Sequence, residues 1–97
     1  MQLGRPIGDL LDMEPDEVGL LLLRALRNDG SRAPNSWTAM AESRQAAHQA
    51  GVNPDDVGLR VAEGWQWLRN QAFLAPSNEY HGDWEVVTRA GRDVDIP

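Results

Sequence analysis

The residues best suited to chemistry in this 97-residue sequence are two histidines, one pair of adjacent aspartates and the arginines. His48 and His81 are expected in different elements. Without cysteine, a zinc site would need carboxylates from elsewhere, so we expect each histidine to be an ordinary surface residue. Asp55 and Asp56 follow an Asn-Pro pair, which predicts first-turn acids of a helix rather than an acid–base pair. No nucleophile-elbow, Walker or glycine-rich dinucleotide motif occurs. We therefore expect no enzyme, no catalytic residue, no metal and no small-molecule cofactor.

Length and composition predict one small domain. A hydrophobic share of 41% with four tryptophans is enough for a compact core. The absence of cysteine excludes disulfides and fits a reducing compartment. The N-terminal residues do not resemble a signal peptide, and the longest apolar run, Leu20 to Leu23, is too short to span a bilayer. We expect a cytoplasmic protein with no membrane partner.

The charges are unevenly distributed along the chain. The formal net charge is −6, and every basic residue is arginine. Residues 1–17 contain five acids and one arginine, whereas the rest of the chain is close to balance. Two interpretations of the missing lysines stay open: a GC-rich genome that favours arginine codons, and arginine retained for bidentate contacts with phosphate or carboxylate.

Capping signals and apolar spacing predict three helices, near residues 15–28, 36–50 and 54–71. The acidic residues 1–13 are expected to form a loosely structured lead-in with a short turn near 7–11. The residues expected in the core are Val18, Leu22, Leu26, Trp37, Met40, Val57, Val61, Trp65, Leu68, Leu74, Trp84 and Val86.

The residues after the third helix predict a β-hairpin that pairs about 73–75 with 84–88. Alternation along the second strand favours Trp84 and Val86 on its inner side. Two helices joined by a glycine-containing turn and followed by a hairpin are typical of a winged helix-turn-helix, a mainly α fold with a small β-hairpin. The alternative is a three-helix bundle with a disordered tail.

Four segments of the chain resemble a known bacterial family: Pro15 to Leu23, Ala62 to Leu68, Phe73 to Pro76 and Gly82 to Gly91. They are similar to the N-terminal winged-helix region of the Ymh-type family, bacterial proteins linked to phage defence and abortive infection. The resemblance implies a winged-helix domain over residues 14–92, with 1–13 as lead-in and 93–97 as tail, in a phage-defence or regulatory setting.

The sequence departs from this family in two ways. Ala72 stands where the long helix usually ends in glycine, and alanine would be strained in the left-handed conformation that glycine supplies. We therefore expect the helix to end near Asn70, which tolerates positive φ better. The family also normally continues into a larger helical domain, whereas this sequence stops at Pro97.

DNA binding is the function that the fold class favours. The exposed face of the third helix offers Arg60 and Gln66, with Arg44 beside it on the second helix. Arginine can pair with guanine, and glutamine with adenine. Arg89 and Arg92 are candidates for phosphate contacts near the wing.

Acidic residues oppose this interpretation. Asp55 and Asp56 begin the helix that would enter the groove, and the wing carries Glu79, Asp83 and Glu85. These carboxylates would face a polyanion, whereas phosphate neutralisation dominates nucleic-acid affinity.

The alternative function is a protein-interaction or dimerisation module. Leu59 and Trp67 lie on the polar side of the third helix, where a large aromatic residue and a leucine would anchor a partner or a second copy. The structural alternative is that Trp67 packs under the wing or against the C-terminus of the first helix.

Overall fold

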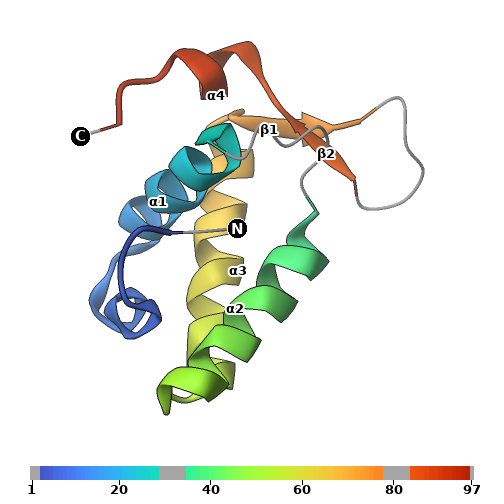
Figure 1. Ribbon diagram of the computed structural model, residues 1–97. Helices are drawn as coiled ribbons and strands as arrows, with labels where there is room; N and C mark the ends of the chain where they lie inside the picture. Colours follow the sequence, from blue (N-terminus) through green and yellow to red (C-terminus); the bar gives the residue numbers. More distant parts are fainter. Residues whose placement is uncertain (1–2, 29–34, 78–83, 97) are drawn as a thin grey trace.

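The computed structural model describes residues 3–28, 35–77 and 84–96 of the chain. The molecule is mainly helical and carries one small antiparallel sheet (Figure 1). In chain order the elements are the 3₁₀-helix η1 (Ile7–Asp12), the helices α1 (Pro15–Asn28), α2 (Ser36–Ala50) and α3 (Pro54–Asn70), the strands β1 (Leu74–Pro76) and β2 (Glu85–Val87), and the helix α4 (Arg89–Asp93).

The helix ends follow local sequence signals. The side chain of Asn53 accepts hydrogen bonds from the backbone N–H groups of Asp55 and Asp56, which caps α3. Asn35 caps α2 in the same way, and Gly51 ends α2 with a left-handed φ of 75°. The three predicted helices are therefore confirmed to within a residue, because capping depends only on neighbours in the chain.

α3 ends at Asn70, as predicted, but the left-handed residue beyond it is Ala72, with φ 60°. The N–H of Phe73 donates to the carbonyl of Leu68 at 2.9 Å, and that of Ala72 donates to the carbonyl of Arg69 at 3.0 Å. These two bonds form a Schellman closure, which requires the left-handed residue. Alanine in this conformation costs about 1–2 kcal/mol, so the turn keeps a strain that glycine would remove.

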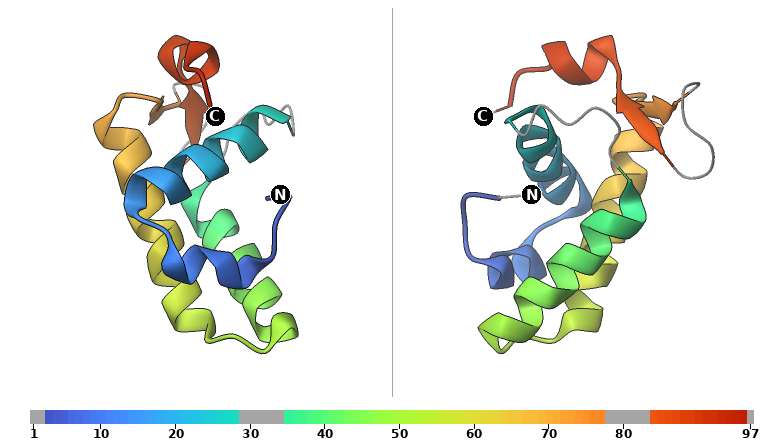
Figure 2. Two further views of the ribbon diagram at one scale, coloured as in Figure 1. Left: turned by 90° about the vertical axis from the view of Figure 1, so that its left-hand side faces the viewer. Right: turned by 45° about the vertical axis from the view of Figure 1, so that its right-hand side comes forward.

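α3 is the central helix, and it packs against both α1 and α2 (Figure 2). Its indole Trp65 is 1% exposed and belongs to the main hydrophobic core. α1 and α3 approach closely where Gly19 lies on Gly64: a Cβ on Gly64 would lie 2.6 Å from Cγ1 of Val18 and 2.9 Å from the backbone nitrogen of Gly19. Glycine is therefore needed at position 64 for this helix contact.

Trp37 is 67% exposed, so its predicted place in the core was wrong. α2 turns three small residues inward, Ala39, Ser43 and Ala47. Position 37 precedes position 39 by two residues, which places it about 200° around the helix and therefore outside. Met40, also predicted in the core, is half-buried at its margin.

The hairpin is confirmed, but its predicted inner side was wrong. The strands pair Leu74 with Val87 and Pro76 with Glu85. Glu85 is 6% exposed, whereas Trp84 is 41% exposed and Val86 is half-buried. A strand has a period of two, so placing Glu85 inside turns Trp84 and Val86 away from the core.

The short turn expected near residues 7–11 is present as a 3₁₀-helix, but the expectation that the lead-in is loosely structured was wrong for residues 7–12. They form η1, which packs against α2 and α3 and buries Leu10 completely. The many acids of this segment point to a solvated tail, but Leu10 and the partly buried Ile7, Leu11 and Met13 pack against the core and anchor it.

The helix α4 was not predicted. Thr88 caps it by accepting a hydrogen bond from the N–H of Gly91, while its hydroxyl also donates to the carbonyl of Ala72 at 2.7 Å. A Cβ on Gly91 would lie 2.5 Å from the carbonyl oxygen of Phe73. α4 therefore packs tightly onto β2 and the residue that precedes β1, which fixes where Arg89 and Arg92 lie.

Candidate nucleic-acid interface

The two candidate arginines nearest the predicted groove-binding helix lie on opposite flanks of α3. The stem of Arg44 lies over Gly58, where a Cβ would be 3.3 Å from its Cγ, and its guanidinium forms an ion pair with Asp55. Arg60 forms an ion pair with Glu63 at 3.2 Å. Positions 58 and 60 differ by about 200° around the helix, so the structure separates Arg44 from Arg60.

The outer face of α3 offers little positive charge. Gln66 is exposed and donates to the side chain of Asn70 at 3.0 Å. Asp55 and Asp56 are exposed, and Leu59 is 57% exposed. All three arginines of α2 and α3 are in ion pairs with acids of the chain.

The third of these arginines, Arg69, belongs to a buried polar cluster that joins α3 to the hairpin. Glu85 accepts hydrogen bonds from Nε1 of Trp65 and from Nε of Arg69, both at 2.6 Å. Such charge-assisted bonds satisfy a carboxylate that would otherwise be costly to bury.

Glu85 therefore does not face outward as a wing acid, and that prediction was wrong. The signal that points to the buried cluster is the spacing of Trp65 and Arg69, which puts two donors on one helix face. The other two wing acids, Glu79 and Asp83, lie outside the described residues.

Trp67 packs against other parts of the domain. A Cβ on Gly19 would lie 2.6 Å from Cε3 of Trp67, so the indole covers that glycine of α1. The indole also meets the ring of Phe73 edge to face, with 5.9 Å between ring centroids. Trp67 therefore packs inside the domain against α1, but near the start of that helix rather than at its predicted C-terminal end.

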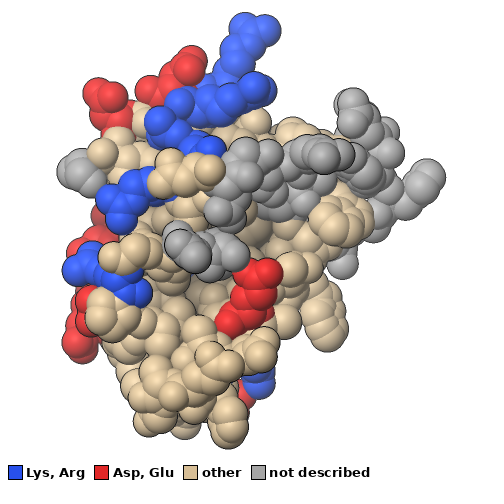
Figure 3. All heavy atoms as spheres, in the orientation of Figure 1, with Lys and Arg blue, Asp and Glu red and all other residues tan. Residues whose placement is uncertain are grey.

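The remaining arginines gather where the end of α1 meets α4. Arg27 donates from Nη1 to the carbonyl of Val94 at 2.8 Å, and Arg24 lies one turn earlier on α1. Arg89 and Arg92 are exposed on α4. Figure 3 shows basic atoms gathered over α4 and the adjoining part of α1, with some acidic atoms beside them. We call Arg24, Arg27, Arg89 and Arg92 the arginine edge.

The arginine edge differs from the other basic residues in its partners. None of its four guanidinium groups pairs with a carboxylate within the described chain. By contrast, each of the other described arginines, Arg5, Arg44, Arg60 and Arg69, does so. In the described part of the chain, the arginine edge is therefore where arginines without a carboxylate partner lie.

The acids of the helices lie mainly at the other end of the molecule. Asp16 and Glu17 begin α1, about 10–17 Å along the helix axis from Arg24 and Arg27 at 1.5 Å per residue. Asp55 and Asp56 begin α3 next to the α2–α3 turn, whereas α4 lies beyond the opposite end of α3 (Figure 1). Asp93 and Asp95 closely follow Arg92, whereas Asp29, two residues after Arg27, lies outside the described residues.

The described residues contain no group of three or more His, Asp or Glu side chains that could hold a metal ion. His48 is exposed on α2, and His81 lies outside the described residues. Within the same part of the chain, no helix combines the length and the apolar character that crossing a membrane requires.

Comparisons with protein-family models, curated proteins and solved structures give no significant match to the chain. The resemblance to the Ymh-type family therefore stays a prediction from the sequence.

Proposed function

We propose that this chain is a non-catalytic winged helix-turn-helix module that binds nucleic acid. The order of α2, a three-residue turn, α3 and an antiparallel hairpin supports this architecture. An isolated antiparallel bridge between Asn35 and Trp84 supports it further, because it ties the start of α2 to the hairpin. A cytoplasmic location and a phage-defence or regulatory setting belong to this proposal through the family resemblance.

The observation that carries the proposal is the arginine edge. A guanidinium group without a carboxylate partner is ready to form bidentate bonds with a phosphate. The arginines on the α3 side must first leave Asp55 or Glu63. We therefore assign the main phosphate contacts to the edge, including the sequence-predicted candidates Arg89 and Arg92, rather than to Arg44, Arg60 and Gln66.

This placement also answers the objection raised by Asp55 and Asp56. α3 is about 25 Å long at 1.5 Å per residue, which exceeds the Debye length of about 8 Å at physiological salt. A duplex on the arginine edge would be screened from Asp55 and Asp56 at the far end of α3. Phosphate contacts carry no sequence information, so we expect binding with little sequence preference.

The test is a fluorescence anisotropy titration of a labelled DNA duplex at several salt concentrations between about 50 and 200 mM. Four phosphate contacts predict a slope of log K against log salt of about −3.6. Replacing Arg89 and Arg92 by alanine should reduce the slope to about −1.8 and weaken binding at the lowest salt.

The matched control is the double variant R44A/R60A, which removes the same charge from the ion-paired arginines. We expect its slope to equal that of the unchanged protein. If R44A/R60A reduces the slope and R89A/R92A does not, the contact surface is α3 and the assignment to the edge is wrong. No binding at about 50 mM salt would overturn the nucleic-acid function itself.

A protein partner bound through Leu59 and Trp67 is the function that competes with this one. Leu59 is exposed, but Trp67 is held against Gly19 and Phe73. An anchor residue must be free to enter a pocket of its partner. The packing of Trp67 therefore leaves this alternative with less support than the arginine edge gives to nucleic acid.

A further inference from the structure

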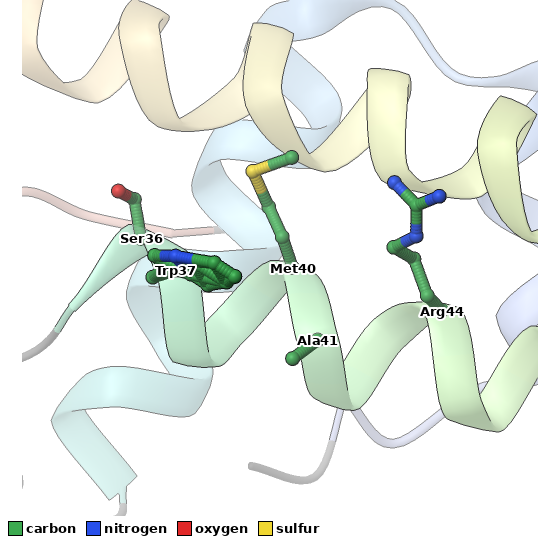
Figure 4. A pocket seen from close by; sticks show the side chains of 5 residues that line it. All are labelled: Ser36, Trp37, Met40, Ala41 and Arg44. Atoms are coloured by element: carbon green, nitrogen blue, oxygen red, sulfur yellow. The ribbon is translucent and has the colours of Figure 1, made fainter.

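The outer side of α2 carries an apolar surface that the nucleic-acid proposal does not use. An open groove of about 580 Å³ is lined, as far as the described residues go, by five side chains of α2: Ser36, Trp37, Met40, Ala41 and Arg44 (Figure 4). Trp37 is 67% exposed, the largest value among the exposed large hydrophobic residues of the described chain. Exposing an indole to this extent forgoes the free energy of burying it, which makes this surface a candidate for an interface.

The lining residues form one stripe along the helix. Positions 37, 40, 41 and 44 are three, four and seven residues apart, the spacing that aligns side chains on a helix face. In Figure 4, Met40 and Arg44 point toward α3, while the indole of Trp37 lies along α2. The stem of Arg44 is fixed over Gly58, and its ion pair with Asp55 holds the guanidinium in place.

This stripe is complementary to itself when two copies of α2 run antiparallel. If the two-fold axis passes between Met40 and Ala41, Trp37 of one copy faces Arg44 of the other, and Met40 faces Ala41. A large side chain then meets a small one, and an indole meets a guanidinium group, which attract each other through a cation–π interaction. A surface that complements itself about a two-fold axis is what a symmetric dimer requires.

We propose that the chain forms a symmetric dimer through α2, in which the groove of each copy is filled by Trp37 of the other. The surface and the ligand differ from those of the nucleic-acid proposal, so neither depends on the other. Because each copy carries a charge of −6, the copies repel at low salt. We expect dimerisation to strengthen as salt rises, whereas DNA binding weakens.

The first measurement is sedimentation equilibrium of the full chain over a range of concentrations. We expect a monomer–dimer equilibrium that tightens with salt and whose dissociation constant rises at least tenfold in Trp37→Ala. Ala41→Arg places a cation against Met40 twice in the dimer and should abolish it, while an exposed helix position tolerates the change. Circular dichroism must show that both variants keep their helices.

The second measurement uses the absence of cysteine from the chain. With a short bismaleimide, Ala41→Cys next to the two-fold axis should cross-link efficiently. Gln49→Cys, exposed two turns further along α2, is the matched control and should stay largely monomeric. A chain that remains monomeric at all concentrations would overturn the proposed dimer. Equal cross-linking at positions 41 and 49 would also overturn it.

Discussion

The arginines of α2 and α3 and those of the arginine edge are chemically identical but have opposite surroundings. Arg44, Arg60 and Arg69 each have a carboxylate within ion-pair distance. Arg24 and Arg89 have none among residues 3–28, 35–77 and 84–96, although they too lie on helices. A guanidinium group that already has a carboxylate contributes to the structure of the domain, whereas one without is available to an anionic ligand. The function of an arginine in this protein is therefore decided by its neighbours.

The paired arginines also differ among themselves. Glu85 is 6% exposed and its two oxygens accept bonds from Trp65 and Arg69. Arg60 and Glu63 have side chains that are 38% and 39% exposed, one turn apart on the same helix. Exposed pairs contribute about 0–1 kcal/mol, whereas a buried carboxylate leaves its donors unsatisfied when it is removed.

The largest expected effect follows from this difference. Glu85→Ala should lower the free energy of unfolding by about 2–3 kcal/mol, because the buried indole N–H loses its acceptor and Arg69 loses its carboxylate. Urea denaturation measures the change. Glu63→Ala is the control and should cost about 1 kcal/mol or less. Equal losses of unfolding free energy in the two variants would show that the buried carboxylate of Glu85 stabilises the domain no more than the exposed one of Glu63.

The next effect concerns the backbone and leaves every charge unchanged. Ala72→Gly should raise the free energy of unfolding by about 1 kcal/mol, because glycine adopts the left-handed conformation of residue 72 without strain. Thermal or urea unfolding checks the shift. The variant also gives a stabilised background in which the two sets of arginines can be compared. A destabilised Ala72→Gly would mean that residue 72 is not left-handed in solution.

The smallest expected effect tests whether α3 takes part in binding. Replacing Asp55 and Asp56 by asparagine should change DNA affinity by less than about twofold, because these acids are far from the arginine edge and screened by salt. If α3 instead entered the major groove, the same variant would bind DNA considerably more tightly. Anisotropy titrations at two salt concentrations distinguish these outcomes. The change should lower helix stability slightly, since first-turn acids favour the helix dipole.

Much of the fold could be predicted because its signals are local. Asn53 caps α3 through bonds to residues two and three positions later, and the apolar stripe of α3 repeats at the helical period. The hairpin was predictable from its alternating strand, although that strand alone does not say which side is buried. The short helix α4 was missed, although Thr88 and the N–H of Gly91 form an ordinary cap.

The candidate sites were less predictable than the helices. Trp37 was expected in the core because it is large and apolar, but the small residues on the opposite side of α2 decide that it faces outward. Trp67 fits between α1 and α3 only because residue 19 is glycine. Both outcomes depend on how closely two helices approach, which a single helix does not encode.

The sequence by itself determined where α1, α2 and α3 begin and end and that a hairpin follows, since capping and periodicity act over a few residues. Only the tertiary structure decided which arginines are neutralised and which side of β2 is buried. Asp55 reaches Arg44 across 11 residues of chain, and Glu85 reaches Arg69 and Trp65 across 16 and 20. Such partners meet only after the helices have packed, and their packing decides which charges remain on the surface.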